Sequence, residues 1–260
     1  MLCAGIIAFF AFGACASSVY LLNDLLDLPD DRQHPSKRHR PLAAGSLSIV
    51  TALWLVPVLL AGAFVLSALA LPPGFVMALG AYYLLTLAYS MYLKRMVMLD
   101  VITLAALYTM RVIAGAQAVA VSTTVWMLAF CIFLFLSLAF VKRYTELRDA
   151  RRQGKQEKLA GRGYFPEDFA LLVSLGGASG YLSVLVLALY INDVAASMLY
   201  RSPQWMWGAC LLLLYWLSRT WINAHRGLMH DDPIVFALRD KVSYLTAFLF
   251  VLIFLLASLI

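Results

Sequence analysis

The sequence has little charge. Only 13% of its 260 residues are Asp, Glu, Lys or Arg, whereas 63% are hydrophobic. Soluble globular domains are usually nearer half apolar and a quarter charged. The composition therefore excludes a soluble domain, a disordered chain and a free nucleic-acid-binding protein. It indicates a polytopic membrane protein.

Cysteine is also scarce, and its pattern carries no chemistry. The sequence has neither a C-x-x-C pair nor a ligand-spaced histidine near its four cysteines, which are Cys3, Cys15, Cys131 and Cys210. All four lie in apolar runs, where free cysteines behave as small buried hydrophobic side chains. We therefore predict neither disulfides nor a cysteine metal site.

Long uncharged runs are what the chain has in abundance. A helix needs about 20 apolar residues to cross a bilayer, and open strands cannot satisfy their backbone groups in hydrocarbon. We predict an all-α polytopic membrane helical bundle that forms one domain over residues 1–260. Its eight spans are predicted over residues 1–22, 49–71, 76–93, 101–121, 125–141, 170–191, 205–221 and 244–260.

The charges gather on one side of the predicted membrane. Eighteen of the twenty Lys and Arg residues, all except Arg111 and Arg201, lie in the loops 23–48, 94–100, 142–169 and 219–243. Because basic loops stay in the cytoplasm, these loops are predicted to face the cytoplasm from the inner membrane. Thirteen of the fourteen acidic residues lie there too. Acids contribute little to topology, so their position predicts a polar reaction chamber on the cytoplasmic face.

The loop after the first predicted span carries aspartates followed by bases. Asp24, Asp27 and Asp31 are spaced i, i+3, i+7 and would share one face of a continuing helix. Neighbouring carboxylates repel unless a cation lies between them, and such oxygen ligands suit Mg²⁺, which substrate phosphates commonly complete. A solvated loop whose acids balance its bases is the alternative. Pro29 is expected to kink or end the helix, so that Asp31 approaches the ion from a loop.

A second acidic cluster precedes the last predicted span. Asp232-Pro233 reads as a helix N-cap followed by the first helical residue, so capping alone would explain Asp232. Asp231 and Asp240 have no such explanation in the sequence. We predict metal ligands among Asp231, Asp232 and Asp240, and the sequence leaves open which of them binds.

Arg111 lies inside a predicted span, where a charge is costly and is expected to face the bundle interior. Leu107 and Asp100 share its helix face, at i−4 and i−11, which directs that face to the cytoplasmic cavity. An internal ion pair is the alternative, but no acidic residue lies inside any predicted span. A phosphate is the expected partner of Arg111.

Most of the charged run over residues 142–162 is expected to be a solvated or lipid-headgroup surface. Only Lys142 and Arg143, which lie nearest the membrane, are predicted to bind substrate. The tyrosines of the third predicted span are expected to pack and to anchor the helix at the interface. An aromatic wall for a cation or an isoprenoid is the weaker alternative for them. These tyrosines are Tyr82, Tyr83, Tyr89 and Tyr92.

The segment from Asn23 to Gly45 resembles the first aspartate-rich motif of the UbiA superfamily of intramembrane prenyltransferases. It matches the pattern N-D-x-x-D-x-x-x-D-R-x-H-P-x-K-x-x-R-P-x-A-x-G. The fullest likeness is to the branch related to decaprenyl-phosphate phosphoribosyltransferase, and it continues in Lys94-Arg95, Arg111 to Gly115 and Lys142 to Leu147. Members have nine helices, with this motif after the second. The resemblance therefore implies a missing leading span, and the branch includes proteins fused to an upstream haloacid-dehalogenase-like phosphatase domain.

The resemblance implies a Mg²⁺-dependent transferase that acts on a polyisoprenoid phosphate in the membrane lipid. In this branch the co-substrate would be phosphoribosyl diphosphate, and no nucleic acid would take part. Catalytic roles are assigned to Asp24, Asp27 and Arg111. Phosphate contacts are assigned to Asn23, Arg32, Lys37, Arg40, Lys94, Lys142 and Arg143. The sequence is compatible with a monomer and with a homo-oligomer.

Three other hypotheses stay open at this point. A polyprenyl diphosphate could be the donor and an aromatic or other small molecule the acceptor, as in other members of the superfamily. A lipid-phosphate transporter is disfavoured, because transporters place ionisable groups near the bilayer midplane and here the acids crowd one face. The third hypothesis is an inactive fragment that lacks the leading helix.

Overall fold

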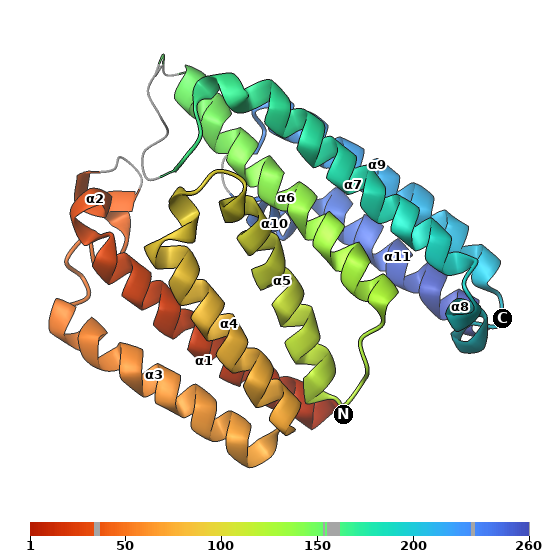
Figure 1. Cartoon of the computed structure of the whole chain (residues 1–260), viewed down its shortest axis with the longest axis horizontal. Helices are drawn as coiled ribbons and strands as arrows, with labels where there is room; N and C mark the ends of the chain where they lie inside the picture. Colours follow the sequence, from red (N-terminus) through yellow and green to blue (C-terminus); the bar gives the residue numbers. More distant parts are fainter. Residues whose placement is uncertain (34–36, 153, 155–161, 230–231, 260) are drawn as a thin grey trace. The chain divides into compact units, whose positions relative to one another are not determined.

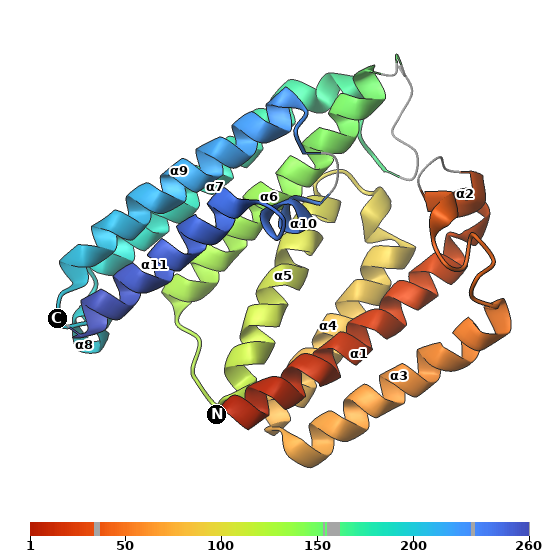
Figure 2. The same cartoon turned by 180° about the vertical axis from the view of Figure 1, so that it is seen from behind.

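The computed structural model describes residues 1–33, 37–152, 154, 162–229 and 232–259. All regular secondary structure in these residues is helical, which confirms the predicted all-α class. The chain forms two compact units, Met1–Leu93 with Met110–Thr123 and Lys94–Thr109 with Thr124–Ile260. Figure 1 shows the helices coloured along the chain, and Figure 2 shows them from behind.

Seven of the described helices are long and apolar enough to cross a membrane, which makes the chain an integral multi-pass membrane protein. They are α1 (Leu2–Leu26), α3 (Ile49–Ala70), α4 (Pro73–Met91), α5 (Leu99–Ala118), α6 (Val125–Arg152), α7 (Phe169–Ile191) and α11 (Lys241–Leu259). The predicted span over residues 205–221 corresponds to α9 (Trp207–Arg226), which is not among the seven. The span count therefore stays a prediction.

Short helices connect the long ones. Five of them lie in or next to the loops that are rich in charged residues: α2 (Leu28–Gln33), η1 (Lys37–His39), η2 (Leu93–Arg95), η3 (Pro166–Asp168) and α10 (Pro233–Ala237). Between α7 and α9 lie α8 (Val194–Leu199) and η4 (Pro203–Met206). The four cysteines are free thiols. Three of them are buried as predicted, whereas Cys3 is exposed.

In the first unit, α1 packs along α3 and against α4. The contact uses small side chains, since Ala11 and Cys15 of α1 and Ala52 of α3 are fully buried. Small residues let membrane helices approach closely where lipid offers no hydrophobic driving force. Ser18 adds an interhelical hydrogen bond, because its hydroxyl donates to the carbonyl of Val56 at 2.8 Å.

In the second unit, α6 packs along α7, and α9 lies against both. Two glycines one turn apart, Gly176 and Gly180 of α7, allow the close approach. A Cβ on Gly176 would lie 2.7 Å from the Cβ of Phe140 and would also overlap the Trp221 ring. The Ser137 hydroxyl donates to the Gly176 carbonyl at 2.7 Å. This contact holds the charged extension of α6 in place.

We expect Gly176→Ala to destabilise the protein by about 1–3 kcal/mol, the usual cost of overpacking. Gly177→Ala is the matched control, because a Cβ at Gly177 meets nothing within 4 Å. Thermal unfolding of both variants in detergent, followed by tryptophan fluorescence, measures the difference. Equal unfolding midpoints for the two variants would contradict the packing described.

Candidate active site

The first aspartate motif lies at the junction of α1 and α2 in the first unit. α1 ends at Leu26, and α2 begins at Leu28. Asp27 is the single residue between them. Pro29 lies in the first turn of α2, where its missing N–H leaves no helical hydrogen bond unmade. Asp31 therefore lies within a short helix, which corrects the expectation that it approaches from a loop.

Helical spacing continues across this junction. The N–H of Asp27 donates to the carbonyl of Asn23, and the N–H of Asp31 donates to the carbonyl of Asp27, both at 2.9 Å. The Asn23 amide also donates to the Asp27 carboxylate at 3.1 Å. The backbone thus keeps the i, i+4 relation between these residues that the sequence spacing predicts.

Arg40 joins the two outer aspartates of the motif. Its Nη1 atom lies 2.8 Å from Asp24 Oδ1 and 2.8 Å from Asp31 Oδ2. The Asp31 side chain is only 3% exposed, whereas that of Arg40 is 38% exposed. The guanidinium charge lowers the repulsion between the two carboxylates, so residues from α1 and α2 meet at one point.

This arrangement fits Mg²⁺ only together with a phosphorylated ligand. Within the described residues, no group of three or more His, Cys, Asp or Glu side chains is close enough to hold a metal ion. Mg²⁺ is nevertheless often bound through one or two carboxylates, with water and substrate phosphates completing the shell. Asp24 and Asp31, held by the same guanidinium, provide such a pair of carboxylates.

The other bases predicted near this motif are placed differently. Arg32 is exposed on α2. Lys37 lies in η1, and its side chain is outside the described part of the structure. Lys94 belongs to η2 of the second unit, where its carbonyl accepts a hydrogen bond from Arg162 at 3.3 Å. Among the predicted phosphate ligands, Arg40 is a base that the structure brings to Asp24 and Asp31.

Arg111 meets an aromatic side chain in the first unit. Its Nη2 atom lies 3.4 Å from the Tyr82 hydroxyl, and its guanidinium carbon lies 5.8 Å from the centre of the Tyr82 ring. A cation over an aromatic ring is attracted by the electron-rich face. Sequence reasoning gave Tyr82 a packing and anchoring role, and this contact with Arg111 was missed.

The second acidic cluster is used for capping and pairing in the second unit. Asp232 caps α10 by accepting the N–H of Ile234 at 2.9 Å, and it pairs with Lys142 Nζ at 2.7 Å. The capping explanation for Asp232 is therefore confirmed, and Lys142 is brought to this acid. Asp231 lies outside the described residues.

Asp240 also has a structural explanation, contrary to the sequence expectation. It immediately precedes α11 and accepts hydrogen bonds from the Ser243 N–H at 2.9 Å and hydroxyl at 2.8 Å. Its two oxygens pair with the Arg219 guanidinium at 2.6 and 3.1 Å. Burial alone would raise the pKa of Asp240, but the hydrogen bonds from Arg219 and Ser243 outweigh it and lower the pKa below 3.8.

The lowered pKa of Asp240 predicts a stabilisation that depends on pH. A carboxylate with a depressed folded-state pKa stabilises the protein above its ordinary pKa, and this contribution is lost as pH falls through the folded-state value. We expect Asp240→Asn, which can still cap α11, to cost about 1 kcal/mol at pH 7. The unfolding midpoints of variant and wild type should converge below about pH 4. A constant difference from pH 7 to pH 3 would show that the charge is not responsible.

Arg143 lies in a buried network of the second unit. Arg143 and Asp100 are both 0% exposed, and their side chains pair at 2.8 Å. Tyr164 donates a 2.6 Å hydrogen bond to the other oxygen of Asp100, and burial followed by the contact with Asp100 raises the pKa of Tyr164. Arg143 also pairs with Glu146. Arg143 thus has no exposed surface for the substrate phosphate that was predicted to bind it.

Removing one member of this network should be costly, because the partner charge is then buried without its ion pair. We expect Asp100→Asn to destabilise the protein by about 3–5 kcal/mol. Replacing both charges, as in Asp100→Leu with Arg143→Met, should cost less than either single change, since apolar replacement of a buried pair is often neutral. Detergent unfolding measures all variants. A stable Arg143→Met variant that has lost only activity would support the phosphate contact instead.

The fold and the site together define a helical membrane protein with an acidic motif suited to a phosphorylated ligand. The chain belongs to the UbiA prenyltransferase family, whose family model matches residues 2–238. Membership confirms the resemblance seen in the sequence and places the chain among transferases. A UbiA homolog from Archaeoglobus fulgidus bound to DMAPP and Mg²⁺ shares the fold, with a TM-score of 0.71 at 15% identity, over 100% of this chain and 89% of that one.

Curated relatives match most of the chain. An uncharacterized protein (y4nM) of Sinorhizobium fredii is 39% identical over 91% of this chain and 46% of its own length. The chain thus spans about half the length of that relative. Nodulation protein NoeC of Azorhizobium caulinodans is 37% identical, over 91% of this chain and 76% of its own. Decaprenyl-phosphate phosphoribosyltransferase of Mycolicibacterium smegmatis is 35% identical, over 91% of this chain and 74% of its own.

Proposed function

We propose that this chain transfers a 5-phosphoribosyl group from phosphoribosyl diphosphate to a polyprenyl phosphate, with Mg²⁺ as the cofactor. The reaction would take place at the cytoplasmic face of the inner membrane. The observation that carries the proposal is the pairing of Asp24 and Asp31 by Arg40, in a chain with relatives named decaprenyl-phosphate phosphoribosyltransferase. Two carboxylates and an adjacent guanidinium are the groups that a metal-bound diphosphate requires.

The first motif would hold the donor. Asp24 and Asp31 would bind the ion, and Asp27 and Asn23 would orient them through the hydrogen bond between their side chains. When bound, Mg²⁺ would neutralise the charge that develops on the leaving diphosphate. Arg40 would exchange its contact with the aspartates for one with a phosphate oxygen of the same donor, because a guanidinium binds carboxylate and phosphate with similar geometry.

The reaction would exchange one bond at the ribose. An oxygen of the polyprenyl phosphate forms a bond to the anomeric carbon of the donor, and the bond from that carbon to the diphosphate breaks. The electron pair leaves with the diphosphate, so no covalent enzyme intermediate is needed. The protein's contribution is to hold the two substrates and to stabilise the charge of the leaving group.

The lipid substrate would lie along the first unit. Arg111, held over the Tyr82 ring in a membrane helix, is the candidate cation for the lipid phosphate. The same unit has an apolar groove of ≈ 780 Å³, which is suited to an isoprenoid chain. Lys94, Lys142 and Asp232 belong to the second unit, and their proposed roles rest on the sequence motifs alone.

A substrate panel tests this function directly. Purified protein given phosphoribosyl diphosphate, polyprenyl phosphate and Mg²⁺ should release diphosphate and form a labelled phosphoribosyl lipid, and EDTA should abolish both until Mg²⁺ is restored. Transfer of a labelled prenyl group from a polyprenyl diphosphate to an aromatic acid, without phosphoribosyl transfer, would establish the rival reaction. Movement of the lipid across vesicles without any product would establish the transporter.

Variants of the first motif give the residue-level prediction. We expect Asp24→Asn, Asp31→Asn and Arg40→Lys each to lower kcat by on the order of 100-fold or more, since each removes a group aimed at developing charge. Lys lacks the planar fork with which Arg40 would bind a phosphate through two parallel hydrogen bonds. Asp193→Asn, outside the charged loops of the sequence, is the control and should retain activity. Wild-type rates for Arg40→Lys would remove the central support for the proposal.

A further inference from the structure

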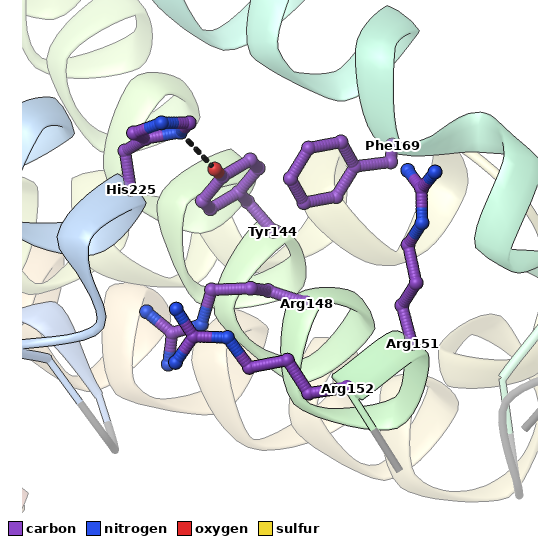
Figure 3. A pocket seen from close by; sticks show the side chains of 6 residues that line it. All are labelled: Tyr144, Arg148, Arg151, Arg152, Phe169 and His225. Carbon is purple, nitrogen blue, oxygen red and sulfur yellow. Dashed lines mark hydrogen bonds between the residues drawn. The ribbon is translucent and has the colours of Figure 1, made fainter. Parts of the chain in front are cut away.

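The second unit contains a cavity that the proposed reaction does not use. It has a volume of ≈ 360 Å³ and is lined by Tyr144, Arg148, Arg151, Arg152, Phe169 and His225 (Figure 3). Its size lies within the range of about 300–1,000 Å³ that is usual for small-ligand pockets. The residues come from the end of α6, the start of α7 and the end of α9, which lie together at one end of the unit in both views (Figures 1 and 2).

The four α6 residues of this pocket share one helix face. Tyr144, Arg148, Arg151 and Arg152 are spaced i, i+4, i+7 and i+8, so their side chains project from the same side. Lys142 and Glu146 lie on another face of α6 and contact Asp232 and Arg143, respectively. The charged end of α6 therefore has two different faces. The sequence predicted a solvated or lipid-headgroup surface for most of residues 142–162, and the pocket lies on one of these faces.

Arg148 forms the fixed floor of the pocket. It is 5% exposed, and it donates hydrogen bonds to the carbonyls of Ala224 and Met229, the latter at 3.1 Å. It also pairs with Asp149 at 2.6 Å. Because these contacts use the chain's own carbonyls at the end of α9, the guanidinium is locked in place before any ligand arrives.

Arg151 and Arg152 form the exposed cationic rim. Both are exposed. The guanidinium carbon of Arg151 lies 5.7 Å from the centre of the Phe169 ring. The side chain of Arg152 reaches the end of α9, where its Nη1 is 2.7 Å from the position that a Cβ on Gly227 would take. The aromatic ring thus holds one guanidinium group and the helix end holds the other, on different sides of Tyr144 in Figure 3.

Tyr144 lies between His225 and Phe169 in the wall of the pocket. Its hydroxyl lies 2.9 Å from His225 Nδ1, and Figure 3 shows these two side chains pointing toward each other, with Phe169 on the other side of Tyr144. The rings of Tyr144 and Phe169 pack in a tilted arrangement, with centroids 4.5 Å apart. The walls are therefore packed, and the exposed charge is confined to the arginine rim.

The charge of the pocket calls for an anion. Among the described residues, Asp149 is the carboxylate that pairs with one of the three guanidinium groups, that of Arg148, and the partial negative charge at the end of α9 compensates only part of the remaining charge. Guanidinium groups recognise phosphate through two parallel hydrogen bonds. A phosphate group with up to two negative charges would balance the rim.

The three arginines follow the apolar part of α6, which ends at Val141. At 1.5 Å per residue, they lie about 10–17 Å further along the helix. Because the headgroup region is roughly 5–8 Å thick on each side of the hydrocarbon core, a helix along the bilayer normal would place them just outside the headgroups. A soluble phosphate compound can approach them there, and their long side chains point the charge back toward a headgroup only if α6 is tilted.

We propose that the pocket lined by Arg148, Arg151 and Arg152 is a phosphate-binding site on the second unit, separate from the first aspartate motif. Its ligand is the phosphate of an anionic phospholipid headgroup or of a soluble phosphate compound, which share the chemistry that the arginine rim recognises. The site does not depend on the proposed phosphoribosyl transfer, because it is formed without any residue assigned to that reaction.

The test removes the rim charges and measures binding rather than catalysis. Wild type, Arg151→Gln/Arg152→Gln and the control Arg239→Gln/Lys241→Gln are purified in detergent. The control removes the same charge from exposed positions of the second unit. Native mass spectrometry counts retained phosphatidylglycerol against phosphatidylcholine, and titration calorimetry measures binding of inorganic pyrophosphate. Each lost arginine should weaken binding about fivefold, and both together roughly 25-fold, as expected for arginines near a phosphate surface.

The outcomes separate the two sources of phosphate. Loss of phosphatidylglycerol by the rim variant alone supports a lipid headgroup site. Loss of pyrophosphate binding by the rim variant alone supports a soluble phosphate site. Equal binding by the rim and control variants in both arms overturns the proposal. Thermal unfolding midpoints within a degree or two of wild type confirm that the exposed substitutions leave the fold intact, and transferase activity is recorded separately.

Discussion

Hydrocarbon does not solvate charge, and this constraint organises the charged residues of both units. A charge inside or at the edge of a membrane helix needs a partner from the protein or a position where water or a headgroup can reach it. Asp100 and Arg143 satisfy the requirement by burying each other. Arg111 satisfies part of it through the Tyr82 ring. Asp24 and Asp31 of the first motif satisfy it through Arg40, which pairs with both carboxylates.

The same constraint explains why the acidic residues of the two clusters have different roles. An aspartate just before a helix is already useful as a cap, and a nearby base stabilises it further. Asp232 and Asp240 each combine both roles, with Lys142 and Arg219 as their bases. At the junction of α1 and α2, by contrast, Asp24 and Asp31 are brought together by Arg40, which we propose also binds a phosphate of the donor. A cluster of acids in a sequence is thus ambiguous until the positions of the caps are known.

The sequence was most informative where the signal is local. The apolar runs located the long helices to within a few residues, as in α3, which was predicted over 49–71 and found at Ile49–Ala70. The aspartate spacing of the first motif predicted a helical relation between its residues, which the backbone hydrogen bonds across α1 and α2 keep. The ends of helices in charged segments are harder to locate from hydropathy, because the hydropathy falls where charged residues begin even when the helix continues. The span of α6 was predicted to end at 141, with Lys142, Arg143 and Glu146 prolonging the helix, and α6 does continue, as far as Arg152.

Pairings between distant segments were out of reach for the same reasoning. Nothing local to Asp100 indicates Arg143 or Tyr164, and nothing local to Asp31 singles out Arg40 among the four bases that follow. One missed feature did have a local signal. The last span was placed from residue 244, whereas α11 begins at Lys241. Starting it there makes Asp240 the preceding residue and Ser243 the third helical residue, which is the pattern of a capping aspartate.

The continuity of α6 has a mechanical consequence. Its 28 residues contain neither proline nor glycine, so it is a stiff rod of about 42 Å, against a hydrocarbon thickness of about 30 Å. A helix of that length must either tilt in the bilayer or protrude from it. A change in the tilt angle displaces the charged end of the helix. Lys142 and Arg143 lie on one flank of that end, and Tyr144 and Arg148 lie on another. A change in bilayer thickness would therefore change the tilt of α6 and move both sets of residues together, because they belong to one rigid helix.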